Sequence, residues 1–428
     1  MLRAIRPAAL NLIAICVIAS LPFSIRAAVD ADEQKNAVAY DSVNNRFLVV
    51  YAEFEPVDIY GSLLGGDGEL LLPSFPIANA PYKQLKPVVA YSPVTETYLV
   101  VWLDHRADDV SGIDIYGQRI SSEGVLLGEN FLISTSGGNE RRPAVAYDSV
   151  NDRFLVTWSA FPQGRNDAAN VLGRIVSSDG SFVGRQFKIG IGPKEQFKPA
   201  LSFDPSTESY LVVWQDRRDE ITSRDDIWGQ VVSADGGLLG DPIRISALPE
   251  SEWRPDVAYD TQRQRHLVVW MRRNGGLADL YGQFVTGGGA LSGPAFVITD
   301  DEGGEVKPAV GYAGQQDLFL VAYMKNGVPE ISGADIHGRF VSGDGEPLEH
   351  PVFIAQGKNV QHRPDIAAKG NLFFVIWTDF RYMSGGDESQ YEVMGRIVAP
   401  EVLTTERLVQ RYENPETVVH QAASGLPV

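Results

Sequence analysis

Cysteine is almost absent from this chain of 428 residues, which contains only Cys16. Cys16 lies in a short apolar run over residues 10–19, which follows a positive segment with Arg3 and Arg6. A charged start, a short apolar run and a small residue after it are typical of a secretory signal peptide. We therefore expect residues 1–20 to be removed from a secreted protein, extracellular or periplasmic. The mature chain would then lack any thiol for a disulfide, a thiolate metal site or a nucleophile.

Long apolar segments and positive charge are also scarce. The N-terminal run is shorter than a typical spanning helix, and no later segment is long and apolar enough to cross a bilayer. The chain has 37 Lys and Arg against 55 Asp and Glu, a formal net charge of −18. Nucleic-acid binding needs a basic surface, so we exclude that class of partner. The balance suits a soluble protein that attracts cations.

Sequence signatures of catalysis are missing as well. HExxH, GxSxG, P-loop and dinucleotide-binding patterns do not occur. The six histidines occupy unrelated positions in the repeat described below, which argues against a histidine metal or nucleophile site. They are His105, His266, His337, His350, His362 and His420.

What the chain does have is an internal repeat of 51 to 56 residues. Each of seven copies opens with Glu or Gln, any residue, and Lys or Arg, and Pro follows in six of them. The opening residues are Glu33, Gln84, Glu140, Gln196, Glu252, Glu305 and Gln361.

Each copy contains four runs rich in Val, Ile, Tyr, Phe and Trp, bounded by turn residues. Such a copy predicts a four-stranded antiparallel meander. Seven copies predict an all-β, seven-bladed β-propeller over residues 21–400, followed by a polar tail over 401–428. A β-solenoid is the rival, but its coils are usually shorter and successive tight hairpins do not suit it.

A propeller must close its ring, and the seventh copy has only three clear strands. Residues 21–27 resemble the fourth strands of other copies, so we expect this N-terminal segment to supply the missing outer strand. That requires cleavage of the signal near Ser20. Cleavage near Ala27 would remove the strand and leave closure to the tail, for which residues 406–412 are the candidate.

The loops of a meander fall on two faces. With the strands labelled A to D from the channel outward, the D–A and B–C loops share one face. The interval that includes the A–B loop is 11 residues in six copies, whereas the interval that includes the B–C loop varies from 10 to 18. Variable loops on a uniform scaffold usually carry binding, so we expect function on the D–A and B–C face.

The Glu or Gln and the Lys or Arg of the repeat form a candidate ring at the channel mouth. One interpretation is a polar collar for an anionic or polyhydroxyl ligand. The other, which seven near-identical copies favour, is an inter-blade network that pins the loops. The following Pro is expected to hold the basic residue in an extended shape. The ligand candidates taken from this ring are Arg142, Lys198 and Arg254.

Three copies carry Asp-x-Arg after the tryptophan that ends strand B, followed by acidic loops. The pairs are Asp104 and Arg106, Asp216 and Arg218, and Asp379 and Arg381. They are candidates for ligand binding or for a carboxylate pair in glycoside chemistry. A Ca²⁺ site is the other reading, with Asp108, Asp109, Asp114, Asp225 and Asp226 as metal candidates. The structural alternative is local Asp–Arg pairing that holds the loop, and the tryptophans are expected to pack between blades.

The sequence resembles bacterial secreted β-propeller repeat proteins with units of the form PAVAYD, FLVVW and DIYGQR, over residues 33–398. The resemblance implies the fold and supplies no catalytic residues. We carry two hypotheses. The first is a non-enzymatic, monomeric binding module for a protein or polysaccharide partner, with Ca²⁺ as an open question. The alternative is a carbohydrate-active hydrolase or lyase that uses the acidic B–C loops.

Overall fold

The computed structural model describes residues 14–19, 25–27 and 36–402, apart from short segments within the last range. Those segments are 54–56, 109, 135–136, 164–168, 219–224, 247, 249, 275–276, 301–302, 327–332, 358–359 and 381–390. Within the described residues every regular element is a β-strand. None of these residues belongs to a helix that could cross a membrane.

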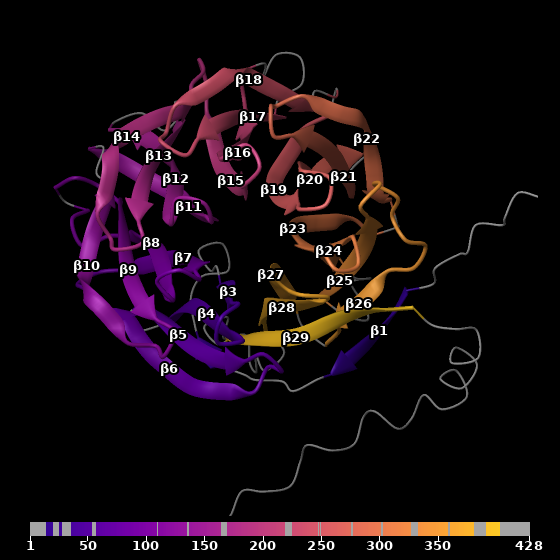
Figure 1. The fold of residues 1–428 in the computed structure, drawn as a ribbon, viewed down its shortest axis with the longest axis horizontal. Helices are drawn as coiled ribbons and strands as arrows, with labels where there is room; N and C mark the ends of the chain where they lie inside the picture. Colours follow the sequence, from indigo (N-terminus) through magenta and orange to yellow (C-terminus); the bar gives the residue numbers. More distant parts are fainter. Residues whose placement is uncertain are drawn as a thin grey trace, which may run out of the picture.

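The strands form seven antiparallel sheets arranged around a central channel (Figure 1), which confirms the all-β, seven-bladed β-propeller. Blade 1 contains β3 (Ala37–Asp41), β4 (Arg46–Glu53), β5 (Asp58–Gly65) and β6 (Leu70–Ala78). Blade 2 contains β7 (Gln84–Ser92), β8 (Thr97–Asp104), β9 (Asp114–Ser121) and β10 (Leu126–Ser134). Blade 3 contains β11 (Gly138–Asp148), β12 (Arg153–Pro162), β13 (Asn170–Ser177) and β14 (Phe182–Gly190).

The remaining blades follow the same order. Blade 4 contains β15 (Gln196–Asp204), β16 (Ser209–Asp216), β17 (Asp226–Ser233) and β18 (Leu238–Ser246). Blade 5 contains β19 (Glu252–Asp260), β20 (Arg265–Asn274), β21 (Leu277–Thr286) and β22 (Leu291–Thr299). Blade 6 contains β23 (Glu305–Ala313), β24 (Leu318–Asn326), β25 (Ala334–Ser342) and β26 (Val352–Ala355). Blade 7 contains β27 (Gln361–Lys369), β28 (Leu372–Asp379) and β29 (Tyr391–Val402), with β1 (Ala14–Ala19) and β2 (Ile25–Ala27) paired to β29.

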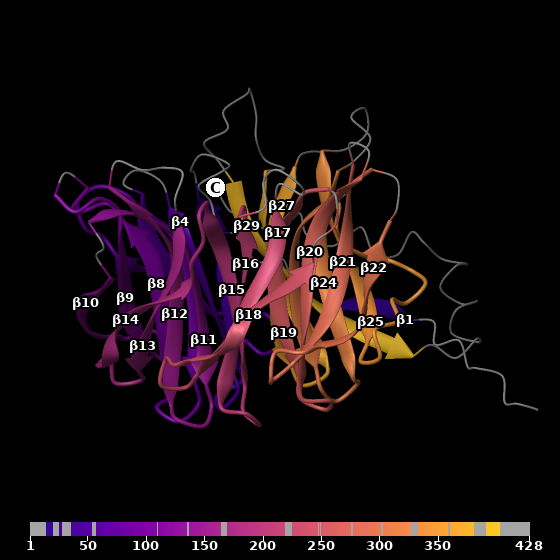
Figure 2. The same cartoon turned by 90° about the horizontal axis from the view of Figure 1, so that it is seen from above.

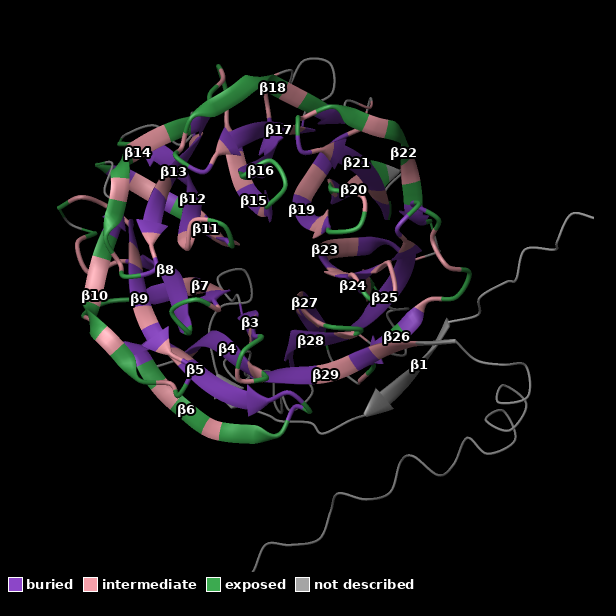
Figure 3. Cartoon of the chain, viewed as in Figure 1, coloured by how far each residue is buried: buried purple, intermediate pink, exposed green. Residues whose placement is uncertain are grey.

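The core lies between the blades, which stand side by side around the ring (Figure 2). The second strand of each blade is covered on both faces by neighbouring blades, so its sequence is a nearly continuous apolar run. β8, for example, is buried along its whole length, whereas the outer strand β10 is largely exposed (Figure 3). The strand-B tryptophans are fully buried, which confirms that they pack inside: Trp102, Trp158, Trp214 and Trp270 are 0% exposed.

The ring is closed by the N-terminal segment, as the sequence predicts. β2 runs antiparallel to β29, with Ile25 opposite Val393. β1, which falls in the expected signal peptide, also pairs with β29, with Ala19 opposite Ile397. β27 contacts β3 across the seam between blades 7 and 1. The backbone N of Val38 donates to Asp365 Oδ2 there at 2.9 Å.

Candidate site at the channel mouth

A cavity of about 350 Å³ lies at the end of the channel where the first strands begin. It is lined by the first strand of every blade or by the residue just before that strand. Gln84 at the start of β7 lies opposite Asp104 at the end of β8, so this end also carries the B–C loops. The cavity therefore opens on the face that the loop lengths favoured.

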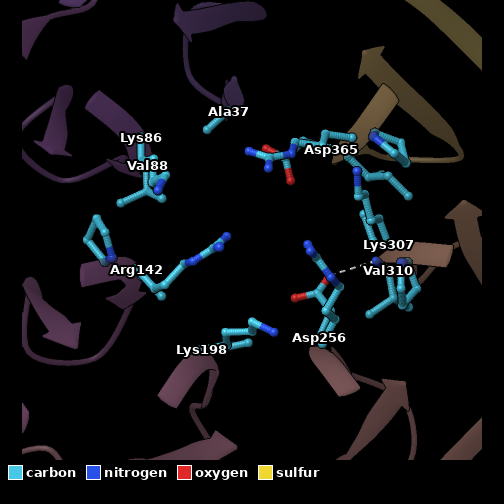
Figure 4. A pocket seen from close by; sticks show the side chains of 18 of the residues that line it. Ala37, Lys86, Val88, Arg142, Lys198, Asp256, Lys307, Val310 and Asp365 are labelled. Atoms are coloured by element: carbon cyan, nitrogen blue, oxygen red, sulfur yellow. Dashed lines mark hydrogen bonds between the residues drawn. The ribbon is translucent and has the colours of Figure 1, made fainter. Parts of the chain in front are cut away.

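The basic residues of the repeat line this cavity (Figure 4). Six of them do so: Lys86, Arg142, Lys198, Arg254, Lys307 and Arg363. Their counterpart in the first copy, Lys35, lies outside the described residues. Asp256 and Asp365 are the lining carboxylates among the described residues. Six cations against two carboxylates make a positive cavity in a chain whose formal charge is −18.

The backbone of these basic residues is left-handed, so the expectation of an extended shape before Pro was wrong. The six φ values lie between +52° and +56°. The cause is a register shift in each first strand, such as the one between Leu85 and Val88, which inserts the Lys–Pro pair as a β-bulge. A bulge residue in this region is usually Gly, because other side chains adopt it at a cost of about 1–2 kcal/mol. Lys or Arg occupies this conformation in all six described copies.

Lys198 shows how the cations affect one another. Its Nζ donates to Gln215 Oε1 at 3.0 Å, and its backbone N donates to Ser159 Oγ at 3.0 Å. Burial, together with repulsion from Arg254 and Arg142, lowers the pKa of Lys198 to about 7. The charge of Asp225 raises the pKa of Lys198. The cavity therefore contains a lysine that titrates near neutral pH.

The two lining carboxylates tie neighbouring blades together. Asp256 Oδ2 accepts a hydrogen bond from the backbone N of Val310 in blade 6 at 2.8 Å (Figure 4). Asp365 makes the equivalent bond to Val38 in blade 1, as described above. The sequence analysis missed both residues as site candidates. The available signal was Asp after Arg-Pro in the fifth and seventh copies, where other copies have Val or Ala.

The Glu or Gln that opens the repeat is fully buried in the six copies where the structure describes it, whereas Glu33 of the first copy lies outside the described residues. In blade 3, Glu140 accepts hydrogen bonds from the backbone N of Ile115 at 3.1 Å and from Ser134 Oγ at 2.8 Å, both in blade 2. Burial raises the pKa of Glu252 to about 7. The two halves of the motif thus diverge: the acid or amide pins the blades, and the base lines the cavity.

Two of the three Asp-x-Arg candidates, in blades 2 and 4, form local pairs beside buried tryptophans. Asp104 is 0% exposed, accepts from Trp102 Nε1 at 2.8 Å and from Arg106 Nε at 2.8 Å. The guanidinium of Arg106 lies 4.0 Å from the centre of the Tyr116 ring. This is the geometry of the structural alternative, a pair that holds the start of the B–C loop.

In blades 4 and 7 the Asp of the motif also accepts a hydrogen bond from the tryptophan two residues earlier. Asp216 accepts from Trp214 Nε1 at 2.8 Å and pairs with Arg218 at 2.7 Å. Asp379 is fully buried and accepts from Trp377 Nε1 at 3.0 Å. Arg381 lies outside the described residues.

Whether a repeat opens with Gln or with Glu correlates with the residue that lies opposite at the end of the second strand. Gln84, Gln196 and Gln361 each lie opposite an Asp in the strand register. Where the repeat opens with Glu252, the opposite residue is Arg272, and Glu252 itself accepts from Trp270 Nε1 at 2.9 Å. In blade 5 the indole therefore takes its acceptor from the first strand, where blades 2, 4 and 7 take it from the second. Blade 3, which opens with Glu140, does not follow this rule, because Trp158 Nε1 has no partner among the described residues.

The metal candidates are engaged in contacts with other side chains. Ser111 Oγ donates to Asp114 Oδ2 at 2.7 Å, and Asp108 lies 3.3 Å from His105 Nδ1. Asp225 accepts from Arg217 Nε at 2.7 Å, and Asp226 accepts from Arg244 at 2.8 Å. Asp109 lies outside the described residues, and within them no three His, Cys, Asp or Glu gather as metal ligands would.

Comparison with known proteins shows the fold alone. No protein-family model and no curated protein matches the chain. A protein of unknown function from Dyadobacter fermentans is 11% identical over 74% of this chain and 94% of its own, with a TM-score of 0.53. An α-L-arabinanase of Penicillium chrysogenum is 15% identical over 75% and 94%, with a TM-score of 0.52. The α-L-arabinofuranosidase Arb93A of Fusarium graminearum is 12% identical over 90% and 99%, also with a TM-score of 0.52.

Proposed function

We propose that this protein is a secreted, non-enzymatic binding module that holds an acidic glycan in the cavity at the channel mouth. The observation that carries the proposal is the set of six cations that line one cavity of a chain with net charge −18. A concave, low-dielectric site of one sign concentrates the field that draws in a ligand of the opposite sign. Guanidinium groups, moreover, match carboxylate and sulfate oxygens in geometry.

A glycan is favoured over other anions by the mixed lining. Asp256 and Asp365 lie within the same cavity. Carboxylates bind the hydroxyl groups of a sugar well, because an ionised carboxylate only accepts hydrogen bonds. The arabinanase, which was solved with arabinobiose, and the arabinofuranosidase, which was solved with an iminosugar inhibitor, share the fold, and this is compatible with a glycan partner.

The alternative of a hydrolase or lyase named the carboxylates of the B–C loops. Asp104, Asp216 and Asp379 are at most 1% exposed, and each is bonded to an indole. A general acid or base must reach the scissile bond, so these side chains do not support that mechanism. If the protein were an enzyme, the cavity carboxylates Asp256 and Asp365 would be its candidates.

A glycan array tests the proposal. We expect the full chain to retain uronate-containing or sulfated glycans in preference to neutral ones, with binding that weakens as salt rises. Chelator should leave this binding unchanged, because the cations of the protein supply the charge. Retention of neutral glycans alone, of acidic peptides instead, or of nothing would overturn the proposal. Turnover of a retained glycan that the D256N/D365N double variant abolishes would establish the enzyme alternative.

A further inference from the structure

The charges of the cavity are distributed unevenly around the ring. Blades 2, 3 and 4 contribute Lys86, Arg142 and Lys198, and the residues after their prolines are Val88, Ala144 and Ala200. Blades 5, 6 and 7 contribute three cations together with Asp256 and Asp365. Figure 4 shows Lys86, Arg142 and Lys198 on one side of the cavity and the two carboxylates on the opposite side. We call blades 2–4 the cationic arc and blades 5–7 the mixed arc.

Burial is the main cause of the lowered pKa of Lys198, and repulsion from two neighbouring cations of the ring adds to it. Arg142, its neighbour within the cationic arc, and Arg254, at the border of the mixed arc, both oppose its charge. Cations that repel one another in a partly buried cavity are stabilised by an anion placed between them. Within the described residues no carboxylate lines the cavity in the cationic arc, so a negative group gains most in that part of the ring.

A second observation comes from blade 1, between the ends of the two arcs. Asn36 lines the cavity and is 2% exposed, and neither its Nδ2 nor its Oδ1 has a hydrogen-bond partner among the residues that the structure describes. A buried amide without partners destabilises the fold, and in a cavity lining a bound water or ligand accounts for it. The amide offers both a donor and an acceptor, which is what a sugar hydroxyl requires.

We propose that the ligand is a sugar acid, whose single oxyanion group binds Lys86, Arg142 and Lys198 while its hydroxyl groups face Asp256, Asp365 and Asn36. This inference rests on the proposed function and specifies its ligand. The oxyanion can be a carboxylate or a sulfate ester, because both present oxygens that guanidinium and ammonium groups bind in the same way. The cavity volume of about 350 Å³ suits one or two sugar residues better than a long chain.

Calorimetry with small probes separates the contribution of the oxyanion from that of the sugar hydroxyl groups. The probes are D-glucuronate, D-glucose 6-sulfate, D-glucose and inorganic sulfate, titrated into the full chain at constant ionic strength. We expect one or both sugar acids to bind at least tenfold more tightly than glucose and inorganic sulfate. Preference for glucuronate or for the sulfate ester identifies which oxyanion the arc takes. Inorganic sulfate that binds as tightly as the sugar acids would refute the role of the mixed arc.

Matched variants test the arcs. K86N/R142N removes two cations from the cationic arc, and K307N/R363N removes two from the mixed arc. Asparagine is chosen because it tolerates the left-handed backbone of these positions, so the bulge is retained. We expect the first variant to weaken binding of the preferred sugar acid at least tenfold and the second less than threefold. Equal losses would refute the arc assignment while leaving the proposed function intact, whereas failure of the wild-type protein to bind any acid would refute both.

A measurement on the wild-type protein keeps the inference testable if a variant does not fold. Contact with one oxyanion predicts that affinity for the sugar acid falls as salt rises, and that any affinity for glucose does not. An affinity for the sugar acid that is independent of salt would overturn the proposal.

Discussion

Replacing Lys198 by Met should stabilise the unliganded protein, because burial and neighbouring cations disfavour the charged form of this lysine. Its pKa falls from 10.5 in an exposed lysine to about 7 in the folded protein. That difference corresponds to at most about 5 kcal/mol of folding free energy at pH 6. Lys198 keeps partial contact with solvent, which screens part of the effect, so we expect the variant to gain about 2 kcal/mol.

The sign of the pH dependence follows from the two pKa values. Between about pH 7 and pH 10.5 the unfolded chain binds a proton at Lys198 that the folded protein does not bind. Raising the pH through this window therefore stabilises the wild-type protein relative to the Met variant. The advantage of the variant should be largest at pH 6 and should shrink to below about 1 kcal/mol at pH 9.

Urea unfolding followed by tryptophan fluorescence measures both quantities. Lys188→Met is a suitable control, because Lys188 is an exposed residue on β14, and it should change stability by less than about 0.5 kcal/mol. A Lys198→Met protein that is less stable than wild type at pH 6, or whose gain is the same at pH 6 and pH 9, would refute the electrostatic reasoning. The same variant should also bind sugar acids more weakly, which would show that the destabilising charge of Lys198 contributes to binding.

Four further perturbations test the scaffold. Asp216→Asn removes the charge from a buried residue that holds an Arg and an indole, and should cost about 3–5 kcal/mol in urea unfolding; a cost below about 1 kcal/mol would contradict the assigned contacts. Gly117→Ala should destabilise by about 1–3 kcal/mol, because the added Cβ would lie 2.8 Å from Ile133 Cδ1, and an unchanged midpoint would mean that this contact relaxes freely. Burial lowers the pKa of His266 to about 4, from 6.5 in an exposed histidine. Between these two pH values the unfolded chain binds a proton that the folded protein does not, so the free energy of unfolding should fall by up to about 3 kcal/mol from pH 6.5 to pH 4. A His266→Phe variant whose free energy of unfolding shows the same dependence on pH would exclude this residue as the cause. A chain that begins at residue 28 should melt at a lower temperature than one that begins at residue 21, since it lacks β2 of blade 7, and equal melting would show that β2 adds nothing to closure.

The repeat determined most of the fold before any coordinates. Spacings of 51 to 56 residues and four apolar runs per copy leave few architectures that bury every copy equally, so blade number and strand order follow from the sequence. The N-terminal origin of the last outer strand was also readable, because residues 21–27 resemble the fourth strands and the seventh copy lacks one. The exchange of Gln84 with Asp104 for Glu252 with Arg272 was present in the sequence too, but its meaning depends on the strand register that brings each pair to one indole.

Only the tertiary structure decided where the charges meet. The sequence analysis placed both charged positions of the motif in one ring. The structure shows that in the six described copies the Lys or Arg lies on a left-handed bulge and lines the channel, while the Glu or Gln two residues earlier is buried between blades. The direction of a side chain in a strand reverses with a shift of one residue, and the bulge supplies that shift. Closure of the ring then brings residues from Asn36 to Asp365 around a single cavity, a proximity across more than 300 positions that the packing of seven blades creates.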